Sequence, residues 1–373
     1  MKILIENAVP LNNGDAALIY ALGDKFEKMG DVVTYSTTNF DKVKKKYPEK
    51  NWISTILTRP GVNRPYIGYL LLIINLLLSK AHRQFDVVIS APGGYINSYY
   101  GFKRRLQLLA FYKKIFKKKV YMYSQSVGPL SSEDEKILQK YIQYFDLFYV
   151  RDDISKNRMD KLGPFENVVQ TKDAAFLLEK KLHVTEDTKK VAISVRSWKH
   201  DNRSEEKYKS LIHQFVKFFY AKNYEVTFLS TCQGDTSYVD DSLMAKEIYG
   251  ELPLDVQQKV KVDSESYTLE QLREKLAGFD YVVGTRLHMC ILSWLSGTPA
   301  FNISYEEKGR ECYNYMNISH YSVDYNYDKD ITEALEKFYE LEDRNKVFEK
   351  VNLIQKESNV LFNKMYQSIL SKG

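Results

Sequence analysis

The chain has 373 residues, of which 44% are hydrophobic, and its 54 basic and 48 acidic side chains give a formal net charge of +6. That length predicts two domains, each with a sizeable core. So small a charge, with no aromatic stacking platform interleaved among the basic residues, argues against binding of nucleic acid. It is compatible with an anionic small substrate or an anionic membrane surface.

The cysteines and the apolar segments indicate in which cellular compartment the protein is located. Cys232, Cys290 and Cys312 form neither a CxxC pair nor a metal-ligand spacing, so no bound metal is predicted, and so sparse a set is typical of a reducing compartment. Residues 1–6 look like a first strand and not a signal peptide. The longest apolar stretch, Tyr66–Leu78, is shorter than the roughly 20 residues that span a bilayer. The sequence therefore predicts a cytoplasmic protein.

Strand and helix signals alternate along the first half of the chain. Apolar runs predict strands at Ile3–Glu6, Val32–Ser36, Phe85–Ser90, Val120–Ser124 and Phe145–Val150. A helix is predicted from about Ala16 to Met29, and the Ser131–Glu135 pattern begins another as a capping box. Ala91–Gly94 and Gln125–Pro129 are predicted to be turns that end two of the strands.

A second alternating series follows the charged stretch Glu179–Lys190, a predicted linker. Its predicted strands are Val191–Arg196, Glu225–Ser230, Tyr281–Gly284 and Ala300–Ile303, and its predicted helices are Ser210–Ala221, Leu269–Ala277 and His288–Ser296. Such alternation predicts α/β domains with parallel sheets, whose ligands bind beyond the carboxyl ends of the strands. We expect two Rossmann-like domains facing a cleft, at residues 1–180 and 190–342, and a C-terminal helix at 343–373 that packs back on the first.

The segment Gly284–His288 lies where a predicted strand ends and a helix begins. Such a start leaves backbone N–H groups and the positive end of the helix dipole free for an anion. Arg286 adds a fork of donors that fits phosphate or carboxylate, and His288 can give or accept a proton. The alternative is an ordinary turn with a surface arginine and a core histidine.

Arg196 is a second candidate, because it directly follows an apolar strand and is expected to project toward the same sheet edge as Arg286. The alternative is a solvated strand end. Two arginines and a histidine in one cleft would suit a ligand that carries both a phosphate and a carboxylate.

The loops of the first half carry smaller polar groups. Within Asn12–Asp15, the Asn and Asp side chains can cap the following helix or hold a sugar hydroxyl. Gly93 and Gly94 permit close approach of a ligand, or form a plain turn. The chain contains neither a GxGxxG after its first strand nor a Walker A, GxSxG or HExxH pattern.

The apolar stretch Tyr66–Leu78 is followed by eight basic residues between Lys103 and Lys119. Together they could rest the first half on an anionic membrane surface. The alternative is a buried helix beside a solvated basic helix face.

Several short motifs occur in a fixed order along the chain. They are Asn12–Asp15 (Asn-x-Gly-Asp), Gly93-Gly94, Gln125–Pro129 (Gln-Ser-x-Gly-Pro), Arg151–Ser155 (Arg-Asp-x-x-Ser), Asp173–Phe176 (Asp-x-Ala-Phe), Arg286-x-His288 before an apolar helix and Gly297-x-Pro299, and Tyr305–Lys308 (Tyr-x-x-Lys). In this order they resemble the polysaccharide pyruvyl transferase family over nearly the whole chain. Departures at Leu11, Ala16, Ala91, Pro92 and Ser98 leave the identity of the acceptor open.

The resemblance implies a fold like that of two-domain GT-B glycosyltransferases. It also implies transfer of a pyruvyl group from phosphoenolpyruvate, as co-substrate and without a further cofactor, onto two hydroxyls of a sugar in a bacterial cell-surface polysaccharide. On this reading the donor site holds Arg196, Gly284, Arg286, Leu287 and Lys308, and the acceptor site holds Asn12, Gly14, Gly93, Gly94, Tyr95 and Gln125. His288 is the general acid, toward either C3 of the donor or the leaving phosphate, and Asp15 is the candidate base.

Two rival functions remain open. A glycosyltransferase with a nucleotide-sugar donor would share the architecture and use the same arginines for a diphosphate. A non-catalytic, membrane-associated assembly factor would account for the apolar and basic segments. The acceptor's carrier, whether a lipid, a nucleotide or a finished polymer, is also open.

Overall fold

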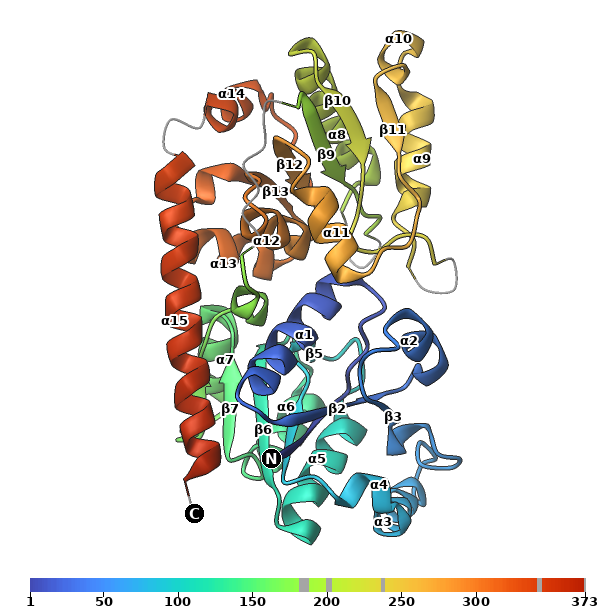
Figure 1. Ribbon diagram of the computed structural model, residues 1–373, viewed down its shortest axis with the longest axis vertical. Coiled ribbons are helices and arrows are strands. Elements are labelled where there is room, and N and C mark those ends of the chain that lie inside the picture. Colours follow the sequence, from blue (N-terminus) through green and yellow to red (C-terminus); the bar gives the residue numbers. More distant parts are fainter. Residues whose placement is uncertain (181–187, 199–202, 236–238, 341–343, 372–373) are drawn as a thin grey trace. The chain divides into compact units, whose positions relative to one another are not determined.

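The computed structural model describes residues 1–373 apart from 181–187, 199–202, 236–238, 341–343 and 372–373. The described chain divides into two compact units, each built around a parallel sheet (Figure 1). Unit 1 comprises residues 1–11, 18–177 and 356–373, and unit 2 comprises residues 12–17 and 178–355. Much of the predicted linker, residues 181–187, lies outside the described residues.

Unit 1 contains an eight-stranded sheet in the order β3-β2-β1-β4-β6-β7-β8, with β5 paired to β6, and its pairings are parallel. The strands are β1 (Lys2–Glu6), β2 (Val32–Thr37), β3 (Trp52–Ser54), β4 (Val87–Ser90), β5 (Gly93–Ile96), β6 (Lys119–Val127), β7 (Leu147–Val150) and β8 (Val168–Gln170). The α-helices are α1 (Asn13–Lys28), α2 (Phe40–Lys46), α3 (Gly68–Leu78), α4 (Lys80–Arg83), α5 (Lys103–Phe116), α6 (Ser132–Ile142) and α7 (Asp153–Leu162). Because parallel strands are covered on both faces, they need continuous apolar runs, and the fully buried β4 is such a run.

Several helices and strands of unit 1 begin or end at other residues than predicted, because of local interactions. Helix α1 starts at Asn13, before the predicted Ala16, because Asn12 Oδ1 accepts hydrogen bonds from two N–H groups of the first turn. The predicted turns Ala91–Gly94 and Gln125–Pro129 are too long, because β5 begins at the glycine pair and β6 continues to Val127 beside it. The predicted helix start at Ser131 is confirmed, since its side chain caps α6.

Unit 2 contains a six-stranded parallel sheet in the order β11-β10-β9-β12-β13-β14. The strands are β9 (Lys190–Ser194), β10 (Glu225–Phe228), β11 (Val260–Val262), β12 (Tyr281–Gly284), β13 (Ala300–Ser304) and β14 (Ser322–Asp324). The α-helices are α8 (Glu205–Ala221), α9 (Ser242–Glu251), α10 (Leu254–Gln257), α11 (Leu269–Leu276), α12 (Leu287–Leu295), α13 (Glu307–Tyr315), α14 (Thr332–Glu340) and α15 (Arg344–Leu370). The α/β class and the two parallel sheets predicted from the sequence are confirmed, although the short edge strands β11 and β14 were not predicted.

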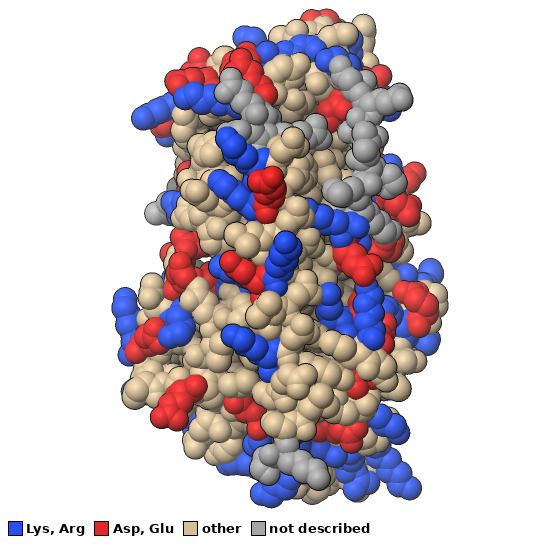
Figure 2. All heavy atoms as spheres, turned by 60° about the vertical axis from the view of Figure 1, so that its left-hand side comes forward, with Lys and Arg blue, Asp and Glu red and all other residues tan. Residues whose placement is uncertain are grey.

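Helix α15 begins in unit 2 and ends in unit 1, as predicted for the C-terminal helix. In unit 2 the ring of Phe348 packs edge-on against Trp294, and in unit 1 Phe362 packs edge-on against Phe26. Across the described ranges, no helix combines the length and the apolar composition needed to cross a membrane. Basic and acidic side chains intermingle over the face of the molecule shown in Figure 2, in line with the modest net charge.

Candidate active site

Tyr208 of α8 ties together the loops that follow β9, β12 and β14 in unit 2. Its hydroxyl accepts a hydrogen bond from the Arg196 N–H (3.1 Å) and shares one with Thr285 Oγ1 (2.7 Å). Its ring stacks on Tyr325 with centroids 4.0 Å apart, and the Tyr325 hydroxyl donates to the Arg196 carbonyl (3.3 Å). Tyr208 is completely buried, so this brace fixes the backbone of Arg196 relative to the start of α12.

The Arg196 guanidinium lies against two aromatic rings. Its Cζ is 4.8 Å from the ring centroid of Trp198 and 4.4 Å from that of Tyr305, and it donates a hydrogen bond to the Tyr305 hydroxyl. Its Nε is buried and has no hydrogen-bond partner among the described residues. A held guanidinium with an unused, buried donor is suited to receive an anionic group.

Lys308, in the first turn of α13, forms an ion pair with Glu306 at 2.6 Å, and its ammonium is 6.0 Å from the Tyr305 ring centroid. Burial opposes ionisation of Glu306, but the Lys308 ammonium and, more weakly, Arg196 lower the pKa of its carboxyl to about 2. Glu306 therefore stays ionised and offsets part of the positive charge here.

Arg286, the N-cap residue of α12, is held by a buried carboxylate that the sequence did not single out. Its Nε and Nη2 both donate to Asp241, each at 2.8 Å, and Asp241 also accepts from Ser230 Oγ at 2.6 Å. Burial disfavours the charged guanidinium, but the Asp241 carboxylate more than compensates, and the pKa of Arg286 is raised. An anionic ligand at Arg286 would therefore share it with Asp241.

His288 lies in the first turn of α12, against the segment of residues 12–17. That segment groups with unit 2, although the sequence suggested the first half, because the Asn13 N–H donates to the Thr231 carbonyl (2.8 Å) and Asn13 Nδ2 to the Tyr267 carbonyl (3.0 Å). A Cβ atom added to Gly14 would lie 2.7 Å from His288 Nδ1. Only glycine lets the backbone lie this close to the imidazole ring.

Asn12 and Asp15 form a helix cap. Asn12 Oδ1 accepts from the N–H groups of Gly14 (2.6 Å) and Asp15 (3.1 Å), and its amide donates to Asp15 Oδ2 at 2.6 Å. The capping alternative of the sequence analysis is therefore observed. Any contact of Asn12 or Gly14 with an acceptor, and the role of Asp15 as a base, stay predictions.

The buried thiol of Cys232, which follows β10, is influenced by four charged side chains of the site. Burial raises the pKa of this thiol to about 12; Arg286 and Arg196 oppose the shift, whereas Asp241 and Asp15 add to it. Arg196, Cys232 and Arg286 follow β9, β10 and β12, so all three belong to the carboxyl edge of the unit 2 sheet.

Gly284 and Leu287 are explained by packing. A Cβ atom at Gly284 would lie 2.4 Å from Cys290 Sγ, so glycine here lets α12 pack on the end of β12. Leu287 is the buried first residue of α12. Their contact with the donor stays a prediction.

In unit 1, the structure places Gly93, Gly94 and Tyr95 on β5, next to Gln125 on β6. Gln125 is completely buried and donates to the Ala91 carbonyl (2.6 Å), so it braces the loop before β5. The Tyr95 hydroxyl hydrogen-bonds to Ser90 at the end of β4, and burial raises the pKa of Tyr95 to about 12. Binding of an acceptor by these residues stays a prediction.

Three of the ordered motifs in unit 1 form one buried polar network. Arg151 donates to Asp173 (3.0 Å) and to Ser126 Oγ (2.6 Å), and Ser126 donates to Asp152 (2.9 Å). Asp152 in turn caps α7 by accepting from the Ser155 N–H at 2.7 Å. Because Arg151 and Asp173 are almost fully buried, this network is structural.

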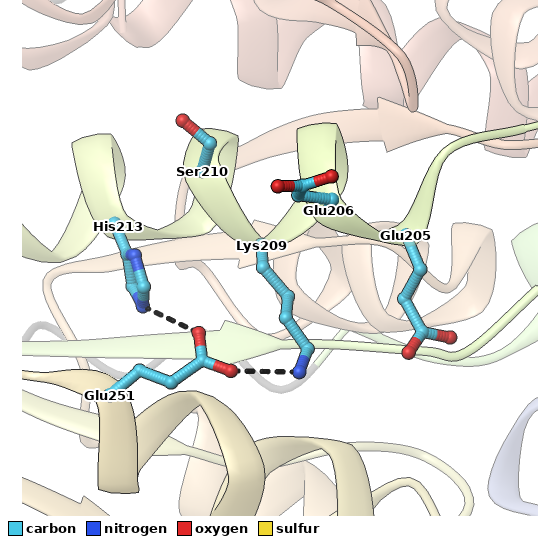
Figure 3. Close-up of a pocket in the computed structure, with 6 residues that line it drawn as sticks. All are labelled: Glu205, Glu206, Lys209, Ser210, His213 and Glu251. Atoms are coloured by element: carbon cyan, nitrogen blue, oxygen red, sulfur yellow. Dashed lines mark hydrogen bonds and ion pairs between the residues drawn. The ribbon is translucent and has the colours of Figure 1, made fainter.

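A separate hollow on unit 2 is lined by side chains of α8 and α9 (Figure 3). Its lining residues are Glu205, Glu206, Lys209, Ser210, His213 and Glu251. Glu251 accepts from Lys209 at 2.8 Å and lies 3.6 Å from His213 Nε2. With three carboxylates against one lysine, this hollow is electrostatically unfavourable for a dianionic donor.

A family model described as polysaccharide pyruvyl transferase matches residues 12–307 of the chain. The amylovoran biosynthesis protein AmsJ of Erwinia amylovora is 30% identical over 249 residues, which cover 61% of this chain and 58% of AmsJ. The chain thus spans less than two thirds of the length of that relative.

Solved structures share the fold at low sequence identity. A glycosyltransferase from Rickettsia africae has a TM-score of 0.66 at 10% identity, covering 100% of this chain and 99% of its own. HepE of Anabaena, bound to UDP and glucose, has a TM-score of 0.62 at 11% identity over 99% of each chain. The UDP-GlcNAc 2-epimerase of Neisseria meningitidis has a TM-score of 0.60 at 11% identity, also over 99% of each. These likenesses confirm a GT-B-like fold and carry no information on substrates.

Proposed function

The chain belongs to the polysaccharide pyruvyl transferase family, and from that premise we propose that it transfers the pyruvyl group of phosphoenolpyruvate onto two hydroxyls of a sugar. In this reaction C3 of the donor gains a proton, and one hydroxyl oxygen bonds to C2. The C2–O bond to phosphate then breaks, and the second hydroxyl closes a cyclic ketal at C2. Of the two hydroxyl protons, one ends on the new methyl group and one on the phosphate.

The observation that supports this donor best is the environment of Arg196. Its aromatic neighbours hold the guanidinium, and its Nε has no hydrogen-bond partner among the described residues, so the group keeps donor capacity for a carboxylate or phosphate oxygen. Lys308, which is paired with Glu306, and Arg286, which is paired with Asp241, are further candidate partners for the donor's two anionic groups.

His288 is the proposed proton-transfer residue. It stands at the N-terminus of α12, against Gly14, and an imidazole can deliver a proton either to C3 or to the departing phosphate. Asp15, on the segment beside it, is the proposed base for the acceptor hydroxyl. Gly93, Gly94 and Tyr95 in unit 1 are the proposed acceptor contacts.

The acceptor is proposed to be a sugar of an extracellular polysaccharide, since the name of AmsJ refers to amylovoran biosynthesis. The sparse, buried cysteines support a reducing, cytoplasmic location. Peripheral membrane contact through Tyr66–Leu78 and Lys103–Lys119, which would suit a lipid-linked acceptor, is part of the same proposal.

The test is a turnover assay with the full chain, phosphoenolpyruvate and a panel of free, nucleotide-linked and lipid-linked sugars. We expect inorganic phosphate to appear only when an acceptor is present, together with a ketal methyl signal in the NMR spectrum of the product. Release of nucleotide from a sugar nucleotide, with phosphoenolpyruvate left intact, would instead establish a glycosyltransferase. No turnover with any donor would support the non-catalytic alternative.

A further inference from the structure

Helix α3 of unit 1 has apolar side chains on two opposite faces. On the inner face, Leu72 and Leu76 are fully buried in the core of unit 1, and Tyr69 packs edge-on against Phe111 of α5. Leu71 and Ile73 are partly buried against the core, and Tyr69 is 41% exposed. Six further large side chains are exposed, at Tyr66, Ile67, Leu70, Ile74, Leu77 and Leu78. We call these six residues the outer face of α3. The buried-helix alternative of the sequence analysis is therefore wrong for this face.

The outer face is continuous along the helix. Ile67, Leu70, Ile74 and Leu77 follow the three- and four-residue spacing of one helix face. Tyr66, which precedes the helix, is 98% exposed and has a φ of 61°, a backbone conformation that bulky residues rarely adopt. A contiguous exposed apolar surface of this kind marks an interaction site.

The charged residues around the outer face are almost all basic. From residue 51 to residue 119 the chain has twelve Lys and Arg residues and one acidic residue, Asp86. Arg59 and Arg64 lie just before the outer face, Lys80 and Arg83 lie just after it, and all four are exposed. Basic residues therefore flank α3 at both ends.

These flanking residues differ from the basic series that the sequence suggested, Lys103–Lys119. The basic residues of that series lie at and beyond the two ends of α5, because its buried middle, Leu106–Tyr112, contains none. Lys113 is paired with Asp146, and Lys119 donates to main-chain carbonyls at the end of α15. The structure therefore adds the residues next to α3 to the basic contribution, beside the exposed Lys103, Lys114 and Lys117 of that series.

We propose that the outer face of α3 and its flanking arginines and lysines dock the protein on an anionic membrane surface. With 11 residues the helix is about 16 Å long, roughly half of what spans a bilayer, so it would lie in the plane of the interface. An exposed tyrosine beside apolar residues suits the boundary between headgroups and acyl chains. Association of two copies through this face is disfavoured, because it would bring their like charges together.

The test is sedimentation of the full chain with vesicles of phosphatidylcholine alone or of phosphatidylcholine with phosphatidylglycerol. We expect binding to the anionic vesicles, and a loss of about tenfold in the partition coefficient for each of Leu70→Ser and Leu78→Ser. Arg64→Gln and Lys80→Gln should each weaken binding to the anionic vesicles about fivefold. Leu254→Ser and Leu243→Ser, at comparably exposed positions of unit 2, should change nothing.

Thermal melts followed by circular dichroism would verify that the variants fold. Unchanged sedimentation of the Leu70→Ser/Leu78→Ser protein would overturn the proposal. So would a concentration-dependent dimer that this double substitution abolishes in the absence of vesicle binding. A chain that binds vesicles normally but leaves phosphoenolpyruvate intact would count against the proposed reaction and not against this surface.

Discussion

Three arginines lie directly beyond the carboxyl ends of parallel strands: Arg151 after β7 in unit 1, and Arg196 and Arg286 after β9 and β12 in unit 2. Arg151 is almost fully buried and bonded to Asp173 and Ser126. Arg286 is bound by one buried carboxylate, Asp241, whereas Arg196 rests on aromatic rings and keeps a donor that no described residue accepts from. A place at a strand end therefore does not make an arginine a ligand-binding residue; the neighbouring carboxylates decide.

The largest expected effect concerns proton transfer by His288. His288→Ala should lower kcat for phosphate release by about 10²–10⁴, because general acid catalysis contributes that much. The measurement is steady-state turnover with a saturating acceptor. His213→Ala, which alters the hollow of Figure 3, is the matched control and should keep normal turnover. Near-normal kcat in His288→Ala would remove the residue from the mechanism.

Asp241→Asn tests what holds Arg286. The change leaves a buried guanidinium without its counter-charge, so we expect a loss of about 3–5 kcal/mol of stability in thermal or chemical denaturation. If the donor's anion also binds at Arg286, phosphoenolpyruvate should raise the Tm of the variant more than that of the wild-type chain. An equal shift in both proteins would make Arg286 purely structural.

Gly14→Ala tests the contact between the first motif and His288. The added methyl group would lie 2.7 Å from His288 Nδ1, so the ring must move, and a displaced catalytic group costs about 10² in kcat. Gly250→Ala is the control, since a Cβ there meets no atom within 4 Å. Wild-type turnover in Gly14→Ala would mean that the position of the imidazole is not critical.

Arg196→Lys and Arg151→Lys together test the arginine comparison directly. A lysine cannot reproduce the stacked, forked geometry, so Arg196→Lys should raise KM for phosphoenolpyruvate about tenfold with little change in Tm. Arg151→Lys should do the reverse and lose about 1–3 kcal/mol of stability with an unchanged KM. If the two variants exchange these effects, the assignment of the two arginines is wrong.

The smallest expected effect is the pH dependence due to Glu306. Its pKa is about 2 in the folded chain, below the ordinary 4.5, so the unfolded chain binds more protons and stability falls as the pH drops from 4.5 toward 2. After allowance for solvent screening, Glu306→Gln should cost about 1 kcal/mol near neutral pH and flatten this acid limb. Glu333→Gln, at an exposed helical ion pair, should alter neither. Urea denaturation at several pH values measures both the stability near neutral pH and its loss in acid.

Much of the fold was readable from the sequence, because alternating strand and helix periodicity is a local property. The strand Tyr281–Gly284 has the bounds that the sequence predicted, and the helix Arg344–Leu370 lies within the predicted 343–373. The short strand β5 was not predicted, because a pair of glycines has little strand propensity and extends here only beside Gln125. For the site, strand ends pointed to Arg196 and Arg286, and the helix start pointed to His288.

By itself, the sequence determined the α/β class, the ordered family motifs and the residues beyond the strand ends, since these depend on spacing along the chain. Only the tertiary structure decided which arginines are neutralised by a carboxylate, because Asp241 and Asp173 lie 45 and 22 residues from Arg286 and Arg151. It likewise brought Gly14 against His288 and left the outer face of α3 in solvent. Each of these outcomes depends on burial and long-range packing, which spacing along the chain does not encode.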